Sequence, residues 1–299
     1  MTRCLVLALA LLACSVPGAA FAARIDIGGG RELYLRCAGS GSPTVLMESG
    51  IHDSSDTWTI TATDYPVPSS PSVFRGVARF TRVCIYDRPG TIRYTDPPAL
   101  TTRSTPVPMP RKLPDVAADI DKLLRRAGLR TPIVTVGHSM GGLITRYFAQ
   151  TYRQQVRGMV LVDAFGTDIK PLMGRLWPRY RQLVNAPPGT ELVTQPVWET
   201  LDIDGAIRAV KRAKPLPRMP LAVVSKTEQF GLTPDFPKDI AARLLEVWPI
   251  TQNRLVPLQP QTPHILATGS DHYVQLHDPD LVTSAIRLIV DRVRRLGAK

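Results

Sequence analysis

One stretch decides the fold: Ile133-Val134-Thr135-Val136-Gly137-His138-Ser139-Met140-Gly141-Gly142. The apolar, β-branched run 133–136 is typical of a buried strand, and the residues from Gly141 to Thr151 have the pattern of a helix. Ser139 lies where the two meet, between two glycines in the pattern Gly-x-Ser-x-Gly. This order of strand, motif and helix predicts a sharp turn that exposes the Ser139 hydroxyl as a nucleophile.

The glycines of the motif have a physical role. The turn holds the serine in a strained backbone conformation, and side chains two positions to either side would collide. The N-terminus of the following helix places positive dipole where an oxyanion would form. The alternative interpretation is an ordinary structural turn with no chemistry.

Strand-like and helix-like segments alternate outward from this stretch, which predicts the α/β class with a mostly parallel central sheet flanked by helices. Two segments around three glycines predict a hairpin, Arg24–Ile27 and Arg31–Cys37. The other strand-like segments are Thr44–Glu48, Arg82–Tyr86, Met159–Val162, Leu221–Val224 and His264–Ala267. The other helical segments are Pro114–Gly128, Lys238–Trp248 and a last one from Asp278 to near Leu296.

With these elements around the motif, the chain resembles the serine esterases and lipases of the α/β-hydrolase fold. The resemblance covers residues 23–299, from the hairpin to the final helix, and implies one domain. It also implies that the segment at about 165–219, rich in Pro, Trp and Arg, is a helical lid inserted between two strands. Amphipathic pieces of this segment are Leu172–Leu183 and Leu201–Ala213. Its apolar Leu172, Leu176, Trp177 and Trp198 indicate an acyl or aromatic substrate, or else pack the lid onto the body.

The resemblance implies a histidine base in the loop between the last strand and the last helix. His272 lies there, within Gly269-Ser270-Asp271-His272-Tyr273. His277, at the start of the last helix, is the rival for this role.

Two carboxylates compete for the acid of the triad. Asp163 ends the strand after the serine helix, a position from which pancreatic-type lipases take their acid. Glu228 follows the next strand, where most family members have an Asp in a Gly-x-x-Asp pattern, but here Ser225 replaces the Gly and Glu replaces the Asp. We therefore favour Asp163 and keep Glu228 as the alternative acid. Either would orient the imidazole and stabilise the imidazolium.

The oxyanion hole is expected to use two backbone N–H groups. Met140, directly after the nucleophile, would supply one. By its match to the family's His-Gly-x pattern, Ser49-Gly50-Ile51 assigns the other to Ile51, with Gly50 allowing close approach. Ser49 departs from the family's His, and the alternative is an ordinary glycine turn.

The N-terminus has the features of an export signal. Arg3 gives a short positive region, Leu5–Ala13 is apolar throughout, and Ala20-Phe21-Ala22 has a small-x-small cleavage pattern. We therefore expect residues 1–22 to be a signal peptide and the mature protein to be secreted or periplasmic. A lipid anchor through Cys14 is the alternative. The apolar run is shorter than the roughly 20 residues of a membrane span, which argues against stable membrane insertion.

Export leaves two cysteines in the mature chain, Cys37 and Cys84, which are a candidate disulfide in an oxidising compartment. In the sheet of the family that the chain resembles, their strands are neighbours. Register decides whether the two meet, and two buried free thiols are the competing interpretation.

The formal net charge is +12, of which Arg3 of the predicted leader contributes one. The basic residues are scattered, without interleaved aromatics or a nucleic-acid motif, so we expect a solvated basic surface and no nucleic-acid partner. No Cys/His cluster has zinc-site spacing, so we expect no metal.

The sequence thus predicts a secreted serine hydrolase that cleaves a small-molecule carboxylic ester through an acyl-enzyme, without a cofactor. The same triad could hydrolyse an amide or a lactone, or transfer an acyl group, and the sequence does not separate these. A catalytically inactive binding protein is the rival from another class. Such proteins usually lack a triad member, whereas Ser139 and His272 are both present.

Overall fold

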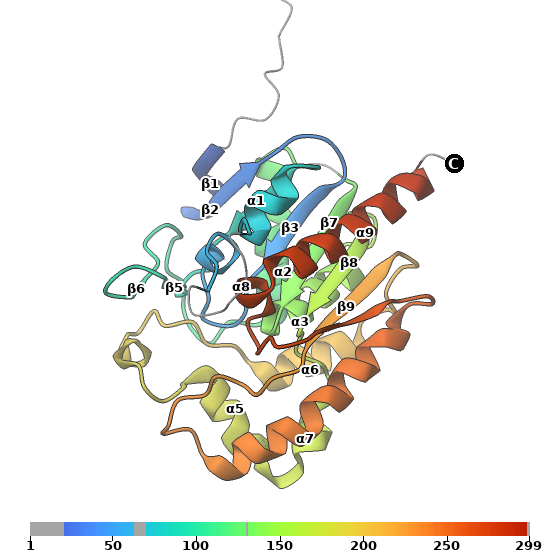
Figure 1. Ribbon diagram of the computed structural model, residues 1–299. Coiled ribbons are helices and arrows are strands. Elements are labelled where there is room, and N and C mark those ends of the chain that lie inside the picture. The colour runs from blue at the N-terminus through green and yellow to red at the C-terminus, as the bar shows by residue number, and fades with distance from the viewer. Residues whose placement is uncertain (1–20, 63–69, 130, 298–299) are drawn as a thin grey trace, which may run out of the picture.

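The computed structural model describes residues 21–62, 70–129 and 131–297. Its centre is an eight-stranded sheet in the order β1-β2-β4-β3-β7-β8-β9-β10 (Figure 1). β1, β2 and β4 pair antiparallel, and from β4 to β10 the neighbouring strands are parallel. The predicted α/β fold with a mostly parallel sheet is confirmed. The strands are β1 (Phe21–Gly28), β2 (Arg31–Ala38), β3 (Thr44–Glu48), β4 (Val83–Tyr86), β7 (Ile133–His138), β8 (Val156–Val162), β9 (Leu221–Lys226) and β10 (His264–Ala267).

Helices cover both faces of the sheet, because the parallel strands are buried on both sides. α2 (Leu113–Arg126) and α3 (Met140–Thr151) contribute to the core on one face. α1 (Val73–Ala78) and α9 (Pro279–Gly297) contribute to the core on the other. Figure 1 shows α9 lying across the strands. Side chains along β7 alternate between the two faces of the sheet, so that Ile133 packs in the first core and Val134 and Val136 pack in the second.

α7 (Lys238–Leu255) is longer than the sequence indicates, because it continues through Pro249. Proline lacks the N–H of a helix interior and usually ends or kinks a helix. Here Thr251, Gln252 and Leu255 are buried beyond the proline, so the packing of the last two turns compensates for the lost hydrogen bond.

The segment between β8 and β9 is largely helical. It contains α4 (Ile169–Met173), α5 (Trp177–Asn185) and α6 (Ile203–Arg212), with single 3₁₀ turns between them. Arg179 of α5 forms an ion pair with Asp239 of α7. Figure 1 shows α5 and α7 beside each other at one end of the sheet. The segment that the sequence predicts as a lid is thus largely helical and lies beside α7.

Cys37 and Cys84 are directly opposite each other in the β2–β4 register and are disulfide-bonded, with Cα atoms 4.1 Å apart. The two strands are thus neighbours and their register brings the two cysteines together, so the predicted disulfide is confirmed. The predicted leader, residues 1–22, lies outside the described residues except for Phe21 and Ala22. These two residues open β1 and pair with Cys37 and Arg36.

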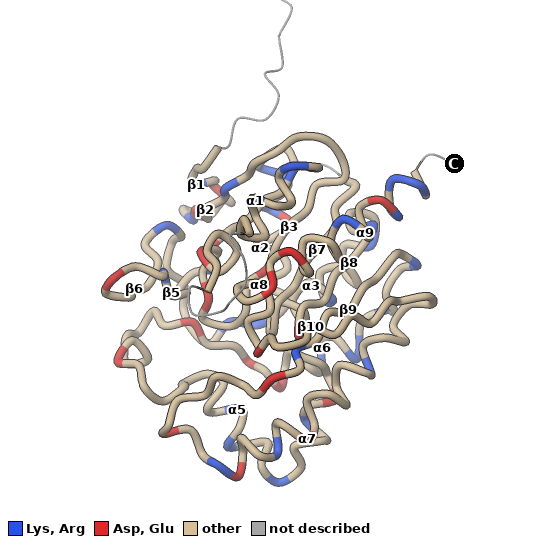
Figure 2. Tube along the Cα trace, in the orientation of Figure 1, with Lys and Arg blue, Asp and Glu red and all other residues tan. Residues whose placement is uncertain are grey.

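The rest of the described chain adds small elements and a mixed surface. A short hairpin of β5 (Ile92–Arg93) and β6 (Ala99–Leu100) follows β4, and α8 (Val274–His277) precedes α9. Figure 2 shows positions of both charge signs spread over strands, helices and loops. No helix among the described residues has the length and apolar character needed to cross a bilayer.

Candidate active site

Ser139 lies at the turn between β7 and α3. Its backbone has φ 51° and ψ −124°, a conformation that is strained for any residue other than glycine. Three backbone hydrogen bonds hold it: Ser139 N–H donates to the Val162 carbonyl at 3.1 Å, and the Ser139 carbonyl accepts from Gly142 N–H at 2.9 Å and from Phe165 N–H at 2.8 Å. The sharp turn that the motif predicts is therefore present.

Gly141 explains the second glycine of the motif. A Cβ at this position would lie 2.5 Å from the Glu48 carbonyl oxygen and 2.6 Å from that of Ser49. Such distances are far inside van der Waals contact, and both obstacles are backbone. Only glycine lets the first turn of α3 pack against the loop after β3, which carries Ile51.

The structure brings Ser139, His272 and Asp163 together. Nε2 of His272 is 2.9 Å from Ser139 Oγ, and Nδ1 is 2.6 Å from Asp163 Oδ2. A carboxylate only accepts hydrogen bonds, so Nδ1 carries the ring hydrogen and donates it to Asp163. Nε2 is then free to accept from the Ser139 hydroxyl. The three side chains form a continuous line of hydrogen bonds from the end of β7 to the end of β8.

Asp163 is fully buried, and both of its carboxylate oxygens have donors. Oδ1 accepts from the Trp248 indole N–H at 2.9 Å and from the Lys226 backbone N–H at 3.3 Å, while Oδ2 accepts from His272. Buried charges need such partners to offset lost solvation. Trp248 and Phe230 also contact the His272 ring, with centroids 5.4 Å and 4.9 Å away.

The rival residues are elsewhere. Glu228 is exposed after β9, and its recorded side-chain contact is with the Thr227 hydroxyl, not with His272. His277 pairs with Asp271 at 2.9 Å rather than with Ser139. The arrangement therefore favours Asp163 and His272 over the two alternatives.

Met140 and Ile51 line one cavity together with Ser139 and His272. The cavity has a volume of about 230 Å³. Met140 is the first residue of α3, a position whose N–H has no partner within the helix. The rest of the lining is mostly apolar and includes Phe165, Tyr180, Leu183, Val184, Phe230 and Trp248.

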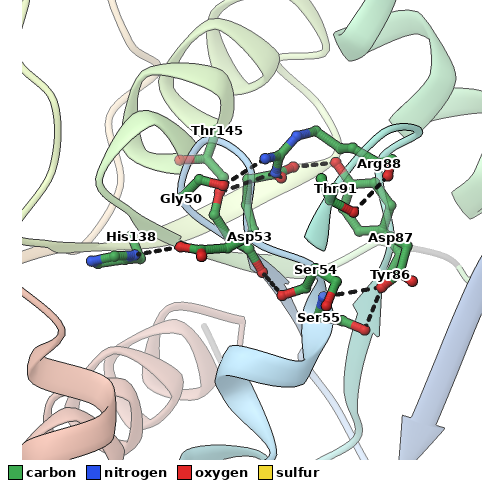
Figure 3. A network of polar contacts seen from close by, with 12 residues as sticks. Gly50, Asp53, Ser54, Ser55, Tyr86, Asp87, Arg88, Thr91, His138 and Thr145 are labelled. Atoms are coloured by element: carbon green, nitrogen blue, oxygen red, sulfur yellow. Dashed lines mark hydrogen bonds and ion pairs between the residues drawn. The ribbon is translucent and has the colours of Figure 1, made fainter. Parts of the chain in front are cut away.

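A buried ion cluster fixes the loop that carries Ile51. The Arg88 guanidinium donates to the carbonyl oxygens of Ser49 at 3.0 Å and Gly50 at 2.6 Å. It also pairs with Glu48 and, at 2.5 Å, with Glu199. Figure 3 shows the Arg88 side chain extending toward Gly50. The backbone of the predicted oxyanion loop is thus set by charge-assisted hydrogen bonds, which are stronger than neutral ones.

The predicted lid segment contributes walls and anchors, but not through the residues that its sequence pattern indicates. Leu172, Leu176, Trp177 and Trp198 do not line the cavity. Trp177 donates its indole N–H to Asp204, and Trp198 stacks on His52 with centroids 4.2 Å apart. Trp177 thus links α5 to α6 within the segment and Trp198 packs the segment onto the body, whereas Tyr180, Leu183 and Val184 line the cavity.

Comparison with known proteins identifies the fold family. The family model of the alpha/beta hydrolase fold matches residues 43–286. The chain belongs to the α/β-hydrolase fold family. This membership supports a hydrolase acting on small molecules, without fixing the bond that is cleaved.

Individual relatives of this α/β hydrolase are distant. A probable transporter, efuK, of Hormonema carpetanum is 30% identical over 162 residues, which are 52% of this chain and 20% of that protein. The chain thus spans about a fifth of that relative's length. A thermophilic esterase from Thermogutta terrifontis is 19% identical with a TM-score of 0.56, covering 92% of this chain and 99% of the other. E-2-(Acetamidomethylene)succinate hydrolase is 18% identical with a TM-score of 0.61, covering 91% and 100%. Likeness at this identity shows the fold alone.

The sequence reasoning missed the ion cluster of this hydrolase. Burial opposes the charge of Glu199, yet the Arg88 guanidinium holds the pKa of Glu199 below its ordinary value. Burial raises the pKa of Glu48 in spite of Arg88. The sequence contains a sign of two residues of this cluster, because Glu48 ends one apolar strand and Arg88 follows another. Glu199 lies in an irregular stretch that gives no such signal.

In the parts of the chain that the structure describes, no group of three or more His, Cys, Asp or Glu side chains is arranged to hold a metal ion.

Proposed function

We propose that this α/β hydrolase cleaves carboxylic esters through a covalent acyl-enzyme, with Ser139 as nucleophile, His272 as base and Asp163 as the acid. The observation that carries the proposal is the line of hydrogen bonds of 2.9 Å and 2.6 Å through His272, starting from a serine in a strained turn. A nucleophile, an oriented base and a third group that orients the base are the signature of covalent serine catalysis.

The steps follow from the geometry. Ser139 Oγ attacks the ester carbonyl carbon as its proton passes to His272 Nε2. Nε2 returns the proton to the leaving alcohol as the C–O bond breaks, which leaves the acyl group on Ser139. Water then repeats the sequence and releases the acid. Asp163 orients the ring and stabilises the imidazolium, without taking the proton itself.

The tetrahedral oxyanion would bind to the N–H groups of Met140 and Ile51. The N-terminus of α3 adds positive dipole at the same point. Arg88 supports this role indirectly, because it fixes the carbonyl groups of Ser49 and Gly50 just before Ile51. A preorganised donor is effective because it needs no rearrangement as charge develops.

The size and lining of the cavity favour a short acyl or aromatic ester as substrate. Its volume of about 230 Å³ is below the roughly 300–1,000 Å³ of pockets for drug-sized ligands. We assign the segment at about 165–219 as a lid, since Tyr180, Leu183 and Val184 wall the cavity. We also place the protein outside the cytoplasm, secreted or periplasmic. The Cys37–Cys84 disulfide supports this placement.

A fluorophosphonate probe tests the nucleophile, because labelling requires an activated serine. We expect the wild type to be labelled and to hydrolyse p-nitrophenyl acetate and butyrate faster than longer esters. Ser139→Ala should abolish labelling and lower hydrolysis by on the order of 10³-fold or more.

Ser225 provides a matched control, since its Oγ is 2.9 Å from His264 Nε2 in a separate cavity. It has a serine–histidine contact but no strained turn. Ser225→Ala should leave labelling at the wild-type level. Labelling that survives in Ser139→Ala and disappears in Ser225→Ala would overturn the proposal.

A further inference from the structure

A second aspartate, Asp53, and a second histidine, His138, lie next to the catalytic His272. His138 immediately precedes Ser139, and Asp53 belongs to the loop that carries Ile51; both are buried. Figure 3 shows the His138 ring facing the Asp53 carboxylate, and Nδ1 is 4.0 Å from Oδ2. The rings of His138 and His272 have centroids 4.7 Å apart. The proposed mechanism uses neither Asp53 nor His138.

The hydrogen on His138 is placed by its partner. Nε2 is 2.8 Å from the backbone carbonyl oxygen of His272. A carbonyl only accepts, so Nε2 carries the hydrogen and donates it. Burial and the neighbouring His272 hold the pKa of His138 well below its ordinary value, so the ring is neutral and Nδ1 is an acceptor. His138 thus holds the backbone of the catalytic histidine.

Nδ1 of His138 is buried and has no hydrogen-bond partner among the described residues. An unpaired buried acceptor is costly. If Asp53 were a carboxylate, two acceptors would face each other. If it were a carboxylic acid, its O–H could donate to Nδ1 once the two atoms close from 4.0 Å to roughly 2.8 Å.

Gly50 keeps the space between the two side chains open. A Cβ on Gly50 would lie 2.8 Å from Asp53 Oδ2 and 3.0 Å from His138 Nδ1. Both atoms therefore face the same point of the backbone, and a side chain there would separate them. This gives the glycine of the oxyanion loop a second role beside close approach.

The surroundings of Asp53 favour a bound proton at weakly acidic pH. Burial raises the pKa of Asp53 to about 6, although Tyr94, Arg88 and His272 lower it. The Tyr94 hydroxyl donates to Oδ1 at 2.8 Å, which leaves Oδ2 on the side of His138. The titratable and charged groups that face Asp53 are Tyr94, Tyr273, Arg88, Glu199, His138 and His272.

We propose that Asp53 and His138 are a positioning pair, in which protonated Asp53 donates a hydrogen bond to His138 Nδ1 and His138 Nε2–H holds the backbone of His272. The proposal rests on the proposed function for its kinetic consequence. When Asp53 ionises, its proton goes to solvent, the bond to Nδ1 is lost and the His272 loop loses one restraint. Both side chains line the cavity, but the hydrogen bond that links them to the catalytic residues runs from His138 to the His272 backbone, so we assign both to act through His272.

The kinetic test is kcat against pH for three proteins, measured by titration of the released acid with a short ester. Relative to Asp53→Asn, which carries a permanent donor and keeps every other ionising group of the site, wild-type kcat should fall roughly fivefold as the pH rises through about 6, the worth of one hydrogen bond. At pH 8 the kcat of Asp53→Asn should therefore exceed that of the wild type. Asp53→Ala has no donor and should be slow at every pH.

The contrast between Asn and Ala is the signature of positioning. If Asp53 had only a structural role, both variants would have a lower kcat than the wild type, and Asp53→Asn would be no faster than Asp53→Ala. The proposal is overturned if Asp53→Asn and Asp53→Ala behave alike, or if Asp53→Asn keeps the wild-type fall.

A second measurement does not depend on hydrolysis. In ¹⁵N-histidine-labelled protein, with His138 assigned by loss of its signals in His138→Gln, the hydrogen should be on Nε2. The Nδ1 resonance should shift with pH in the wild type and stay constant in Asp53→Asn. A hydrogen on Nδ1, or a constant Nδ1 signal in the wild type, would refute the pair. If the wild type were not labelled by the fluorophosphonate, the proposed function would be refuted. The histidine resonances would then still test the hydrogen bond between Asp53 and His138.

Discussion

Asp163–His272 and Asp53–His138 are two aspartate–histidine pairs of the same composition, and their rings are neighbours, but the carboxylates meet the rings differently. Asp163 is 2.6 Å from a ring nitrogen that carries a hydrogen. Asp53 is 4.0 Å from a ring nitrogen that carries none, because the hydrogen of His138 is on the other side of the ring. The backbone carbonyl of His272 therefore decides the chemistry of the second pair.

The difference teaches that hydrogen-bond donors, more than burial, separate the two carboxylates. Both aspartates are buried. Asp163 has three donors, from His272, Trp248 and the Lys226 backbone, which can offset a buried negative charge. Asp53 has the Tyr94 hydroxyl as a donor to Oδ1 but faces the acceptor Nδ1 of His138 with Oδ2, so a bound proton satisfies two groups at once. Asp163 can therefore act as a charged partner of the base His272, whereas protonated Asp53 can pass a hydrogen bond on to His138.

Asp163→Asn should break the first pair and produce the largest effect. The amide would offer the wrong hydrogen-bond pattern to His272 Nδ1, so the ring would adopt the wrong tautomer. We expect kcat to fall by a factor of roughly 10⁴, about 5.5 kcal/mol. Steady-state hydrolysis of a short p-nitrophenyl ester measures this loss. Glu228→Gln is the control, and we expect it to change kcat less than twofold. The opposite ranking would transfer the acid to Glu228.

How much of this site could be predicted from the sequence differs from residue to residue. The Ser139 turn is local, because strand, motif and helix are contiguous, and the sequence predicts it with its backbone strain. The choice between Asp163 and Glu228 is not local. It depends on which strand end faces His272, and the family pattern pointed to both positions.

Other features lie outside sequence patterns for a different physical reason. Asp53 and His138 are 85 positions apart, since 138 − 53 = 85, and they become neighbours because β3 and β7 pair in parallel, with Glu48 opposite Gly137. Glu199 reaches Arg88 from a segment without regular structure. The continuation of α7 through Pro249 likewise follows from tertiary burial, which overrides the local preference of proline.

Glu199→Gln would test whether the loop that carries Asp53 depends on its ion cluster. The variant leaves the buried Arg88 with Glu48 as its only charged partner in the cluster. Breaking a buried pair from one side costs about 3–5 kcal/mol, so we expect a loss of this order in the free energy of unfolding. Urea titration followed by circular dichroism measures it. Glu191→Gln, an exposed residue of the same segment, should be neutral; equal stabilities of the two variants would contradict the anchoring role.

Asp53→Asn should sharpen the contrast through the pH dependence of stability. The pKa of Asp53 is about 6 in the folded protein, against an ordinary value of 3.8 in an unfolded chain, so folding favours the protonated form. Wild-type stability from this group is complete below pH 4 and is lost as the pH rises through 6, by up to about 3 kcal/mol. Asparagine cannot ionise, so the variant should gain stability relative to the wild type between pH 4 and pH 8.

Urea unfolding of both proteins at the two pH values measures this gain. Asp235→Asn, at an exposed position, is the control for the loss of a charge. If the stability difference between Asp53→Asn and the wild type were the same at pH 4 and pH 8, Asp53 would be ionised throughout. The two pairs would then not differ in charge state.

Trp248→Phe should give the smallest effect, because it removes one of the three donors to Asp163 and keeps most of the ring. The Lys226 backbone N–H and His272 remain to hold the carboxylate. A hydrogen bond to a charged group contributes about 1.5 kcal/mol, so we expect kcat to fall roughly tenfold.

Trp58→Phe is a matched control, since Trp58 is fully buried and its indole N–H has no hydrogen-bond partner among the described residues. It changes the same ring volume without removing a hydrogen bond, so kcat should stay within about twofold of the wild type. Comparing kcat with KM for both variants separates the two contributions of Trp248, since its ring also lines the cavity. A change in KM alone would show that Trp248 only shapes the cavity. The donors that distinguish Asp163 from Asp53 would then reduce to His272 and the Lys226 backbone.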